Sequence, residues 1–194
     1  MGLFDIISKP LEPSQLEQPV GWGTSTEDWD YTLEMDNYIQ KLKLYENARQ
    51  IGYSDGSWTP HDSLEGGTRT VGYGHKLGPY DDPNRVYSEE EVDSMLVSDV
   101  FNAYRSLRRH FRNSKYDWNG LTDEDKVVLT ELLYNTGNSK MLEKAMEYLG
   151  SGEDKKDYTS LKELISKRGY RDTEGKFHPL TNRNEDIIQS YLRR

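Results

Sequence analysis

Residues that could cleave a glycosidic bond are concentrated in one stretch of the chain, Leu44–Leu77. Glu46 follows an apolar and aromatic helical pattern, and Asp55 and Glu65 come after it. The stretch closes on a strand-like run, TVGYGH at residues 70–75, in which two glycines let the backbone bend or pack closely. Glycoside hydrolysis needs one protonated carboxyl group, and a second group that activates water or stabilises an oxocarbenium ion. An acid at a helix end facing polar groups on a sheet would meet that need.

The pattern before Glu46 predicts how this acid is placed. One helix face is formed by residues spaced four and three apart: Tyr31, Met35, Tyr38, Leu42 and Tyr45. We expect this helix over about residues 27–49, with Asp36-Asn37 as a point where it could break and a second helix begin. Glu46 lies one turn beyond Leu42, where lost hydration raises the pKa of a carboxyl group, as a general acid requires. Without the downstream motif, the preferred interpretation of Glu46 would be an ordinary solvated residue at a helix end.

Several ordered motifs resemble those of the phage-type lysozymes, the muramidases of glycoside hydrolase family 24. In that family a catalytic Glu is followed nine positions later by an Asp, and then by a Thr that opens a T-[IV]-G-[YI]-G-H run. The matching residues here are Glu46, Asp55 and Thr70. Leu133–Gly137 is similar to the family's F-N-x-G helix end, and Leu180–Arg183 to its G-L-x-N-R segment.

The resemblance covers about residues 38–192 and implies both a fold and an activity. The implied fold is α+β and lysozyme-like, with a small antiparallel sheet lobe, a mostly helical lobe and the active-site cleft between them. The implied substrate is peptidoglycan, cut at the β-1,4 bond between N-acetylmuramic acid and N-acetylglucosamine. Glu46 would protonate the departing oxygen, and Thr70 with a second carboxylate would position water. The resemblance implies no cofactor and no metal.

The sequence departs from the family's spacing between Asp55 and Thr70, where only a short turn is usual. Residues 57–67 look like an insertion, which brings Glu65 close to Thr70. Asp55 keeps the family's spacing from Glu46, whereas Glu65 approximately keeps the spacing to Thr70. The second catalytic carboxylate is therefore Asp55 or Glu65. We favour Asp55, because a strand directly after a helix end fixes position better than a long loop does.

Four further residues are candidates for contact with the sugar chain. Tyr73, Tyr134 and Asn135 are expected sugar contacts, and a packing role is the alternative for each. His75 could act as a base in isolation. Because it follows two glycines in the motif, we expect it to brace the sheet against Glu46 or against the backbone.

The composition excludes several classes of protein. The chain has 194 residues, a formal net charge of −9 and no cysteine. The length fits one domain with an appended arm, and the missing thiols exclude disulfides and thiolate metal sites. The acidic balance argues against nonspecific nucleic-acid binding. No apolar run approaches the roughly 18–20 residues of a membrane span. We expect synthesis in the host cytoplasm and action in the periplasm or cell wall, with a possible place in the virion.

The remaining chain predicts a mixed architecture. Gly, Thr, Tyr and Pro are frequent in residues 51–87, which favours a small irregular antiparallel sheet. Helices are expected over about residues 88–111, 122–137, 141–149, 160–168 and 182–192, with caps at Ser88, Thr122 and Ser160. Residues 171–177 are expected to form a turn. Four arginines near the end of the first of these helices suit the helix dipole. We interpret them as a solvated helix end, and contact with an anionic glycan is the alternative.

The N-terminal region is expected to be an arm, residues 1–25, before a lysozyme-like domain over residues 26–194. Prolines and glycines punctuate it, and a small apolar cluster lies at its tip. It is either a loosely packed terminus or a docking peptide for another virion protein. The enzyme itself is expected to be a monomer. Two other functions stay open: a virion structural or adaptor protein with a weakened lysozyme-like domain, and a lytic transglycosylase, which needs only one Glu. The sequence leaves open whether the protein acts in host lysis or in entry.

Overall fold

Helices account for most of the chain that the structure describes. The computed structural model describes residues 32–46, 50–63, 68–137, 139–149, 156–172 and 174–193. The expected N-terminal arm and Glu65 lie outside these residues. The helices are α1 (Leu33–Glu46), α2 (Glu89–Arg112), α3 (Asp123–Thr136), α4 (Ser139–Leu149), α5 (Tyr158–Ser166) and α6 (Thr181–Tyr191).

The strands are short and antiparallel, and they form three small sheets. One sheet has the order β1-β2-β6, with β1 (Tyr53–Ser54), β2 (Ser57–Trp58) and β6 (Tyr87–Ser88). A second has the order β3-β4-β5, with β3 (His61–Asp62), β4 (Arg69–Val71) and β5 (His75–Lys76). The third is a hairpin of β7 (Gly169–Arg171) and β8 (Phe177–Pro179), where the sequence predicted only a turn. The predicted α+β class is confirmed.

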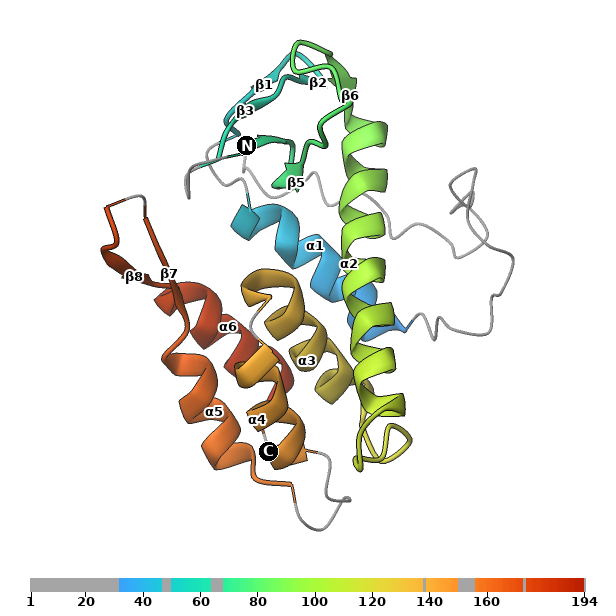
Figure 1. The fold of residues 1–194 in the computed structure, drawn as a ribbon, viewed down its shortest axis with the longest axis vertical. Coiled ribbons are helices and arrows are strands. Elements are labelled where there is room, and N and C mark those ends of the chain that lie inside the picture. Colours follow the sequence, from blue (N-terminus) through green and yellow to red (C-terminus); the bar gives the residue numbers. More distant parts are fainter. Residues whose placement is uncertain are drawn as a thin grey trace, which may run out of the picture.

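The long helix α2 connects the two regions of the molecule. Figure 1 shows the strands β1–β6 at one end of α2, the helices α3–α6 along its other half, and α1 between them. Gly72, in the turn after β4, has φ +60°, and a Cβ there would overlap the side chain of Val92 on α2. Glycine is therefore required at this position, both for its backbone conformation and for the close approach of the turn to the helix.

The helix ends follow local sequence signals, with one correction. Ser88 and Glu91 form a reciprocal capping box at the start of α2, as predicted. Thr122 begins α3 in the same way. By contrast, α5 is capped by Asp157, whose carboxylate accepts a hydrogen bond from the backbone N–H of Ser160. The predicted cap at Ser160 is therefore wrong, because the aspartate three residues earlier takes that role.

The first helix also differs from one of the predicted alternatives. α1 runs without a break through Asp36 and Asn37. Met35, Tyr38 and Ile39 are buried on either side of this pair, and their packing holds the residues in one helix. Tertiary burial of an apolar face outweighs the tendency of Asp and Asn to end or start a helix. The continuous helix delivers Glu46 to its C-terminal end.

The main core surrounds α3, as its apolar circumference predicts. Val127, Val128, Leu129 and Leu132 of this helix are fully or almost fully buried. They pack in one cluster with residues of α1, α2, α4, α5 and α6. A smaller cluster under the sheets contains Trp58, Val71, Tyr87 and Val92. Three polar residues of α3 are buried as well, Asp125, Thr130 and Glu131, and Glu131 leads to the candidate site.

Candidate active site

Glu46 is the last residue of α1, and its side chain is 20% exposed. A Cβ atom placed on Gly74 would lie 3.7 Å from Glu46 Oε2, so the turn between β4 and β5 lies against this carboxyl group. Gly74 has φ +90°, a conformation that favours glycine. The structure thus places the acid at the end of a helix and beside the TVGYGH run, as the sequence predicted.

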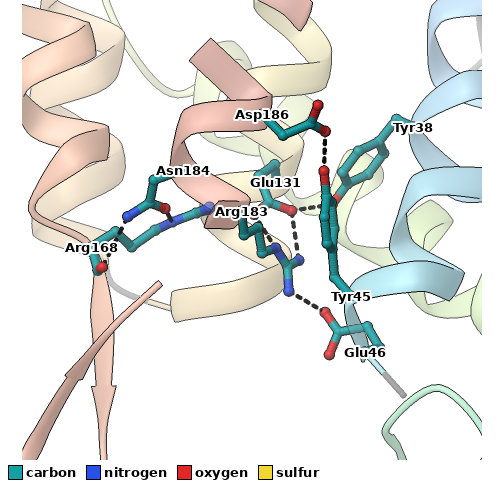
Figure 2. Close-up of polar contacts among 8 residues, drawn as sticks. All are labelled: Tyr38, Tyr45, Glu46, Glu131, Arg168, Arg183, Asn184 and Asp186. Atoms are coloured by element: carbon teal, nitrogen blue, oxygen red, sulfur yellow. Dashed lines mark hydrogen bonds and ion pairs between the residues drawn. The ribbon is translucent and has the colours of Figure 1, made fainter. Parts of the chain in front are cut away.

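Arg183 of α6 holds one oxygen of this acid. Its Nη1 donates a hydrogen bond of 2.5 Å to Glu46 Oε1 (Figure 2). The same guanidinium lies 5.3 Å from the ring centroid of Tyr45, which precedes the acid on α1. Figure 2 shows Glu46 Oε2 pointing away from Arg183. The ion pair therefore fixes the orientation of the carboxyl group through a single oxygen.

A buried glutamate fixes the arginine in turn. Arg183 Nε and Nη2 donate to Glu131 Oε1 and Oε2, each at 2.8 Å. The Tyr38 hydroxyl also donates to Glu131 Oε2, at 2.6 Å. Arg168 Nη1 lies 2.5 Å from Glu131 Oε1, an ion pair whose geometry is not that of a hydrogen bond. Glu131 is fully buried, so it requires these partners.

The electrostatics of this network keep its members charged. Burial alone would raise the pKa of Glu131, but Arg183 and Arg168 together hold it below its usual value. Burial likewise opposes the charge of Arg183, while Glu131 and Glu46 raise its pKa well above the usual value. Arg183 therefore presents a permanent positive charge to Glu46. Desolvation of Glu46, expected from the sequence, favours the protonated acid, whereas the guanidinium of Arg183 favours the ionised carboxylate.

Other side chains position the elements around the network. Arg168 Nε donates to Asn184 Oδ1 at 2.8 Å, and Asn184 Nδ2 donates to the Arg168 backbone carbonyl at 3.0 Å. These bonds tie the start of the β7–β8 hairpin to α6. On the other side, the Tyr45 hydroxyl donates a short hydrogen bond to Asp186, which also pairs with Lys41 at 2.7 Å. The helix that ends in the acid is thereby fastened to the helix that carries the arginine.

The structure corrects the expected partner of His75. Its Nδ1 lies 2.9 Å from Asp99 Oδ2 on α2, and not against Glu46 or the backbone. This bond raises the pKa of His75, although burial of the ring opposes the rise. His75 therefore braces β5 against α2, the same helix that contacts Gly72. Thr70, on β4, is buried, and it lies opposite Lys76 of β5 in the sheet.

Tyr73 and Tyr134 occupy different surroundings. The Tyr73 ring lies 5.5 Å from that of Trp58, and burial followed by the charge of Asp93 raises its pKa to about 12. Tyr134 is more enclosed: burial, then Glu46 and Asp99, raise its pKa well above the usual value. Tyr134 lies near the end of α3, and the charge of Glu46 is one of the causes of its raised pKa. Asn135 follows it and is partly buried.

The second carboxylate remains a prediction. Asp55 is exposed in the turn between β1 and β2 with φ +48°, and the Ser54 hydroxyl lies 3.4 Å from its Oδ2. Glu65 lies outside the described residues. The structure thus brings Glu46 together with Arg183 and Gly74, and the choice between Asp55 and Glu65 stays open.

Sequence reasoning missed Arg183 and Glu131 as members of the site. Arg183 closes the segment that resembles the family's G-L-x-N-R motif, but its partner is 137 residues away. Glu131 carried a signal of its own: it is an acid within a helix that is apolar around most of its circumference. A buried acid must be paired. That rule could have predicted a cation for Glu131, although not which one.

The described residues contain neither a cluster of metal ligands nor a helix that could span a membrane. No group of three or more His, Cys, Asp or Glu side chains in this part of the chain could hold a metal ion. Over the same residues, no helix is long and apolar enough to cross a membrane.

Comparison with known proteins gives one result. The sequence model of the family described as Phage lysozyme matches residues 45–186. This range includes Glu46, the TVGYGH run and Arg183. Neither the search of curated proteins nor the search of solved structures found a match.

Proposed function

Because the chain belongs to the phage lysozyme family and is a peptidoglycan-lytic enzyme, we propose that it is a muramidase. It cleaves the β-1,4 bond between N-acetylmuramic acid and N-acetylglucosamine. The observation that carries this proposal is the position of Glu46. This acid ends a helix, lies against the TVGYGH turn and is held through one oxygen by Arg183.

Glu46 acts as the general acid. Its proton goes to the glycosidic oxygen as the bond to the muramic acid carbon breaks, so the departing sugar leaves as a neutral alcohol. Arg183 has two effects on this step. It fixes the orientation of the carboxyl group, and it stabilises the carboxylate that remains after the proton has left. Glu131 and Tyr38 hold the arginine in place, so they are positioning residues.

A second carboxylate activates water on the opposite face of the sugar. We assign this role to Asp55, with Glu65 as the alternative, and Thr70 helps to hold the water. A held water gives inversion at the anomeric carbon, and places the two carboxyl groups roughly 6.5–9.5 Å apart. NMR of the nascent reducing sugar tests this step. An α product from the β-linked chain supports inversion, and a β product shows retention and rejects the held-water mechanism.

Digestion of purified cell walls separates the proposed activity from its alternatives. We expect mass spectrometry of the soluble fragments to find hydrated reducing ends on N-acetylmuramic acid. Anhydro ends would identify a lytic transglycosylase. Intact walls after incubation with folded protein would identify a structural or adaptor protein. The biological setting that we propose is phage-mediated lysis or entry, after synthesis in the host cytoplasm.

A further inference from the structure

One histidine of the sheet region has a buried ring nitrogen that the proposed reaction does not use. His61 lies on β3, and its Nε2 is buried without a hydrogen-bond partner among the residues that the structure describes. A buried polar group that makes no hydrogen bond costs free energy, because it has lost its contact with water. Buried side chains with such an unpaired atom are found where catalysis or binding uses the atom.

The other ring nitrogen determines which form of the imidazole is present. His61 Nδ1 lies 3.1 Å from the backbone carbonyl oxygen of Asp62. A carbonyl oxygen only accepts hydrogen bonds, so Nδ1 carries the proton of the neutral ring. Nε2 is then unprotonated, and its lone pair can accept a hydrogen bond. The histidine therefore offers an acceptor, and not a donor, to the group that lies beside Nε2.

The register of the sheet places this acceptor beside Thr70. His61 of β3 lies directly opposite Thr70 of β4. Opposite side chains of antiparallel strands point to the same face, with Cβ atoms about 4.5–5.5 Å apart. Val71 and His75 form the next opposite pair and alternate to the other face, which packs against α2. His61 and Thr70 therefore share the face that points away from α2.

A glycine makes room for the histidine ring. A Cβ on Gly52 would overlap the carbonyl oxygen of Thr59 and would lie 3.1 Å from His61 Cδ2. Gly52 has φ +83°, a conformation that favours glycine. The backbone N–H of Thr59 donates to the Gly52 carbonyl at 2.8 Å, which fixes the glycine in this place. The ring opposite Thr70 thus packs against the connection that follows α1 and Glu46.

We propose that His61 positions the hydroxyl group of Thr70 for catalysis. In the substrate-bound enzyme the Thr70 hydroxyl donates a hydrogen bond to His61 Nε2, which turns the lone pairs of the hydroxyl oxygen toward the attacking water. The water donates to this oxygen and directs its own lone pair at the anomeric carbon. Because Nε2 is buried, it is out of reach of solvent water, and Thr70 is the hydroxyl opposite it.

His61 acts through Thr70, so it is a positioning residue, and its role rests on the proposed function. No proton is transferred to the ring, because the second carboxylate takes the proton of the water. Hydrogen bonds of catalytic groups are often long without substrate and tighten in its complex.

Two amide variants separate the roles of the two ring nitrogens. Asparagine can replace the Nδ1–H donor but places nothing at Nε2, whereas the longer glutamine can put its carbonyl oxygen where Nε2 accepts. We expect His61→Asn to lower kcat on soluble glycan strands about five- to tenfold, the contribution of one hydrogen bond, with KM unchanged. His61→Gln should keep kcat within about twofold of wild type, since it keeps the acceptor. His110→Asn, an exposed site on α2, is the control and should leave kcat unchanged. Urea unfolding checks that each variant is folded.

A double-mutant cycle tests whether His61 acts through Thr70. The hydroxyl is missing in Thr70→Val, so adding His61→Asn to that variant should cause no further loss of kcat. A loss as large as in the wild-type background would show that His61 acts elsewhere, and would overturn the proposal. Equal kcat values for wild type and His61→Asn would overturn it too.

NMR of the histidine rings gives a readout that does not depend on activity. Proton–nitrogen correlations of the folded protein should identify His61 in the form with the proton on Nδ1. A proton on Nε2 would make this atom a donor and would reject the proposed hydrogen bond. Wild-type protein that releases no reducing sugar from cell walls would reject the proposed function, and this role with it. Active wild type with unaffected His61 variants would reject the role of His61 alone.

Discussion

Glu46 is the residue on which the proposed reaction depends most. An amide in its place keeps the shape of the side chain and still accepts the hydrogen bond from Arg183, but it cannot donate the catalytic proton. We expect Glu46→Gln to lower the rate of wall lysis by about 10²–10⁴, the usual contribution of general acid catalysis. Turbidity measurements on isolated walls give the rate, and urea unfolding checks the fold. Glu34→Gln, on the same helix, is the control. Full lysis by folded Glu46→Gln protein would reject the assignment.

The second carboxylate can be identified by a matched pair of variants. Asp55 follows α1 and β1 directly, and its spacing from Glu46 is that of the family. We therefore expect Asp55→Asn to cost far more activity than Glu65→Gln, with both proteins equally stable. Asp62→Asn, on β3, controls for loss of charge in this region. The reverse order of the first two variants would move the catalytic role into residues 57–67.

At the scale of elements, His75 and Asp99 connect β5 to α2. The pKa of His75 is raised in the folded protein, mainly by its bond to Asp99. A raised histidine pKa contributes stability that is complete below its unfolded value of about 6.5, and that is lost as the pH rises through the folded value. Replacing Asp99 by Asn should therefore cost about 1 kcal/mol at pH 5.5, since the pair is partly exposed, and less at pH 8.5. Urea unfolding at both pH values measures this. A cost that does not change with pH would contradict a charged pair.

Glu131 fastens α3 to α6 and to the start of the hairpin. Removing its charge takes the anion from the buried Arg168 and leaves Arg183 with Glu46 as its anionic partner. Breaking a buried ion pair from one side costs about 3–5 kcal/mol, so we expect Glu131→Gln to lose that much stability. Glu143→Gln, an exposed site on α4, should change the free energy of unfolding by less than about 0.5 kcal/mol. Similar values for the two variants would show that the buried network contributes little to folding.

The same elements show how far the sequence alone could be interpreted. Ser88, Thr122 and Gly137 act through neighbours within a few residues, so the ends of α2 and α3 were predictable. The packing of the TVGYGH turn was also predictable, because two glycines in a strand-like run indicate close backbone approach. The partners of His75 and Arg183 were not. These partners lie on helices that only tertiary packing brings close to His75 and Arg183. The periodicity of one segment contains no information about such contacts.

The β7–β8 hairpin could not be predicted because its strands are too short to show a pattern. Its strands have three residues each, and Gly169 lies where a Cβ would overlap the ring of Phe177. So short a strand has too few residues to show an alternation of apolar and polar side chains. The turn at Gly175 was therefore predictable, but the paired strands on either side of it were not. Its neighbours Arg168 and Asn184 fix the hairpin through bonds that no local pattern indicates.

For the whole molecule, the extent of the core decides what the N-terminal region contributes. Among the described residues, the main core cluster runs from Met35 to Leu192, and the backbone carbonyl of Thr32 accepts the first bonds of α1. Deleting residues 1–25 should therefore leave stability within about 1 kcal/mol and leave hydrolysis of soluble glycan unchanged. Urea unfolding and a reducing-sugar assay measure the two quantities.

Deleting residues 1–36 is the matched comparison, because it removes the first turn of α1 with Met35 and should destabilise the protein by several kcal/mol. If the shorter deletion alone prevents folding, residues 1–25 belong to the core and the domain begins earlier than residue 26. If it folds but loses hydrolysis, the N-terminal region contributes to the site that contains Glu46.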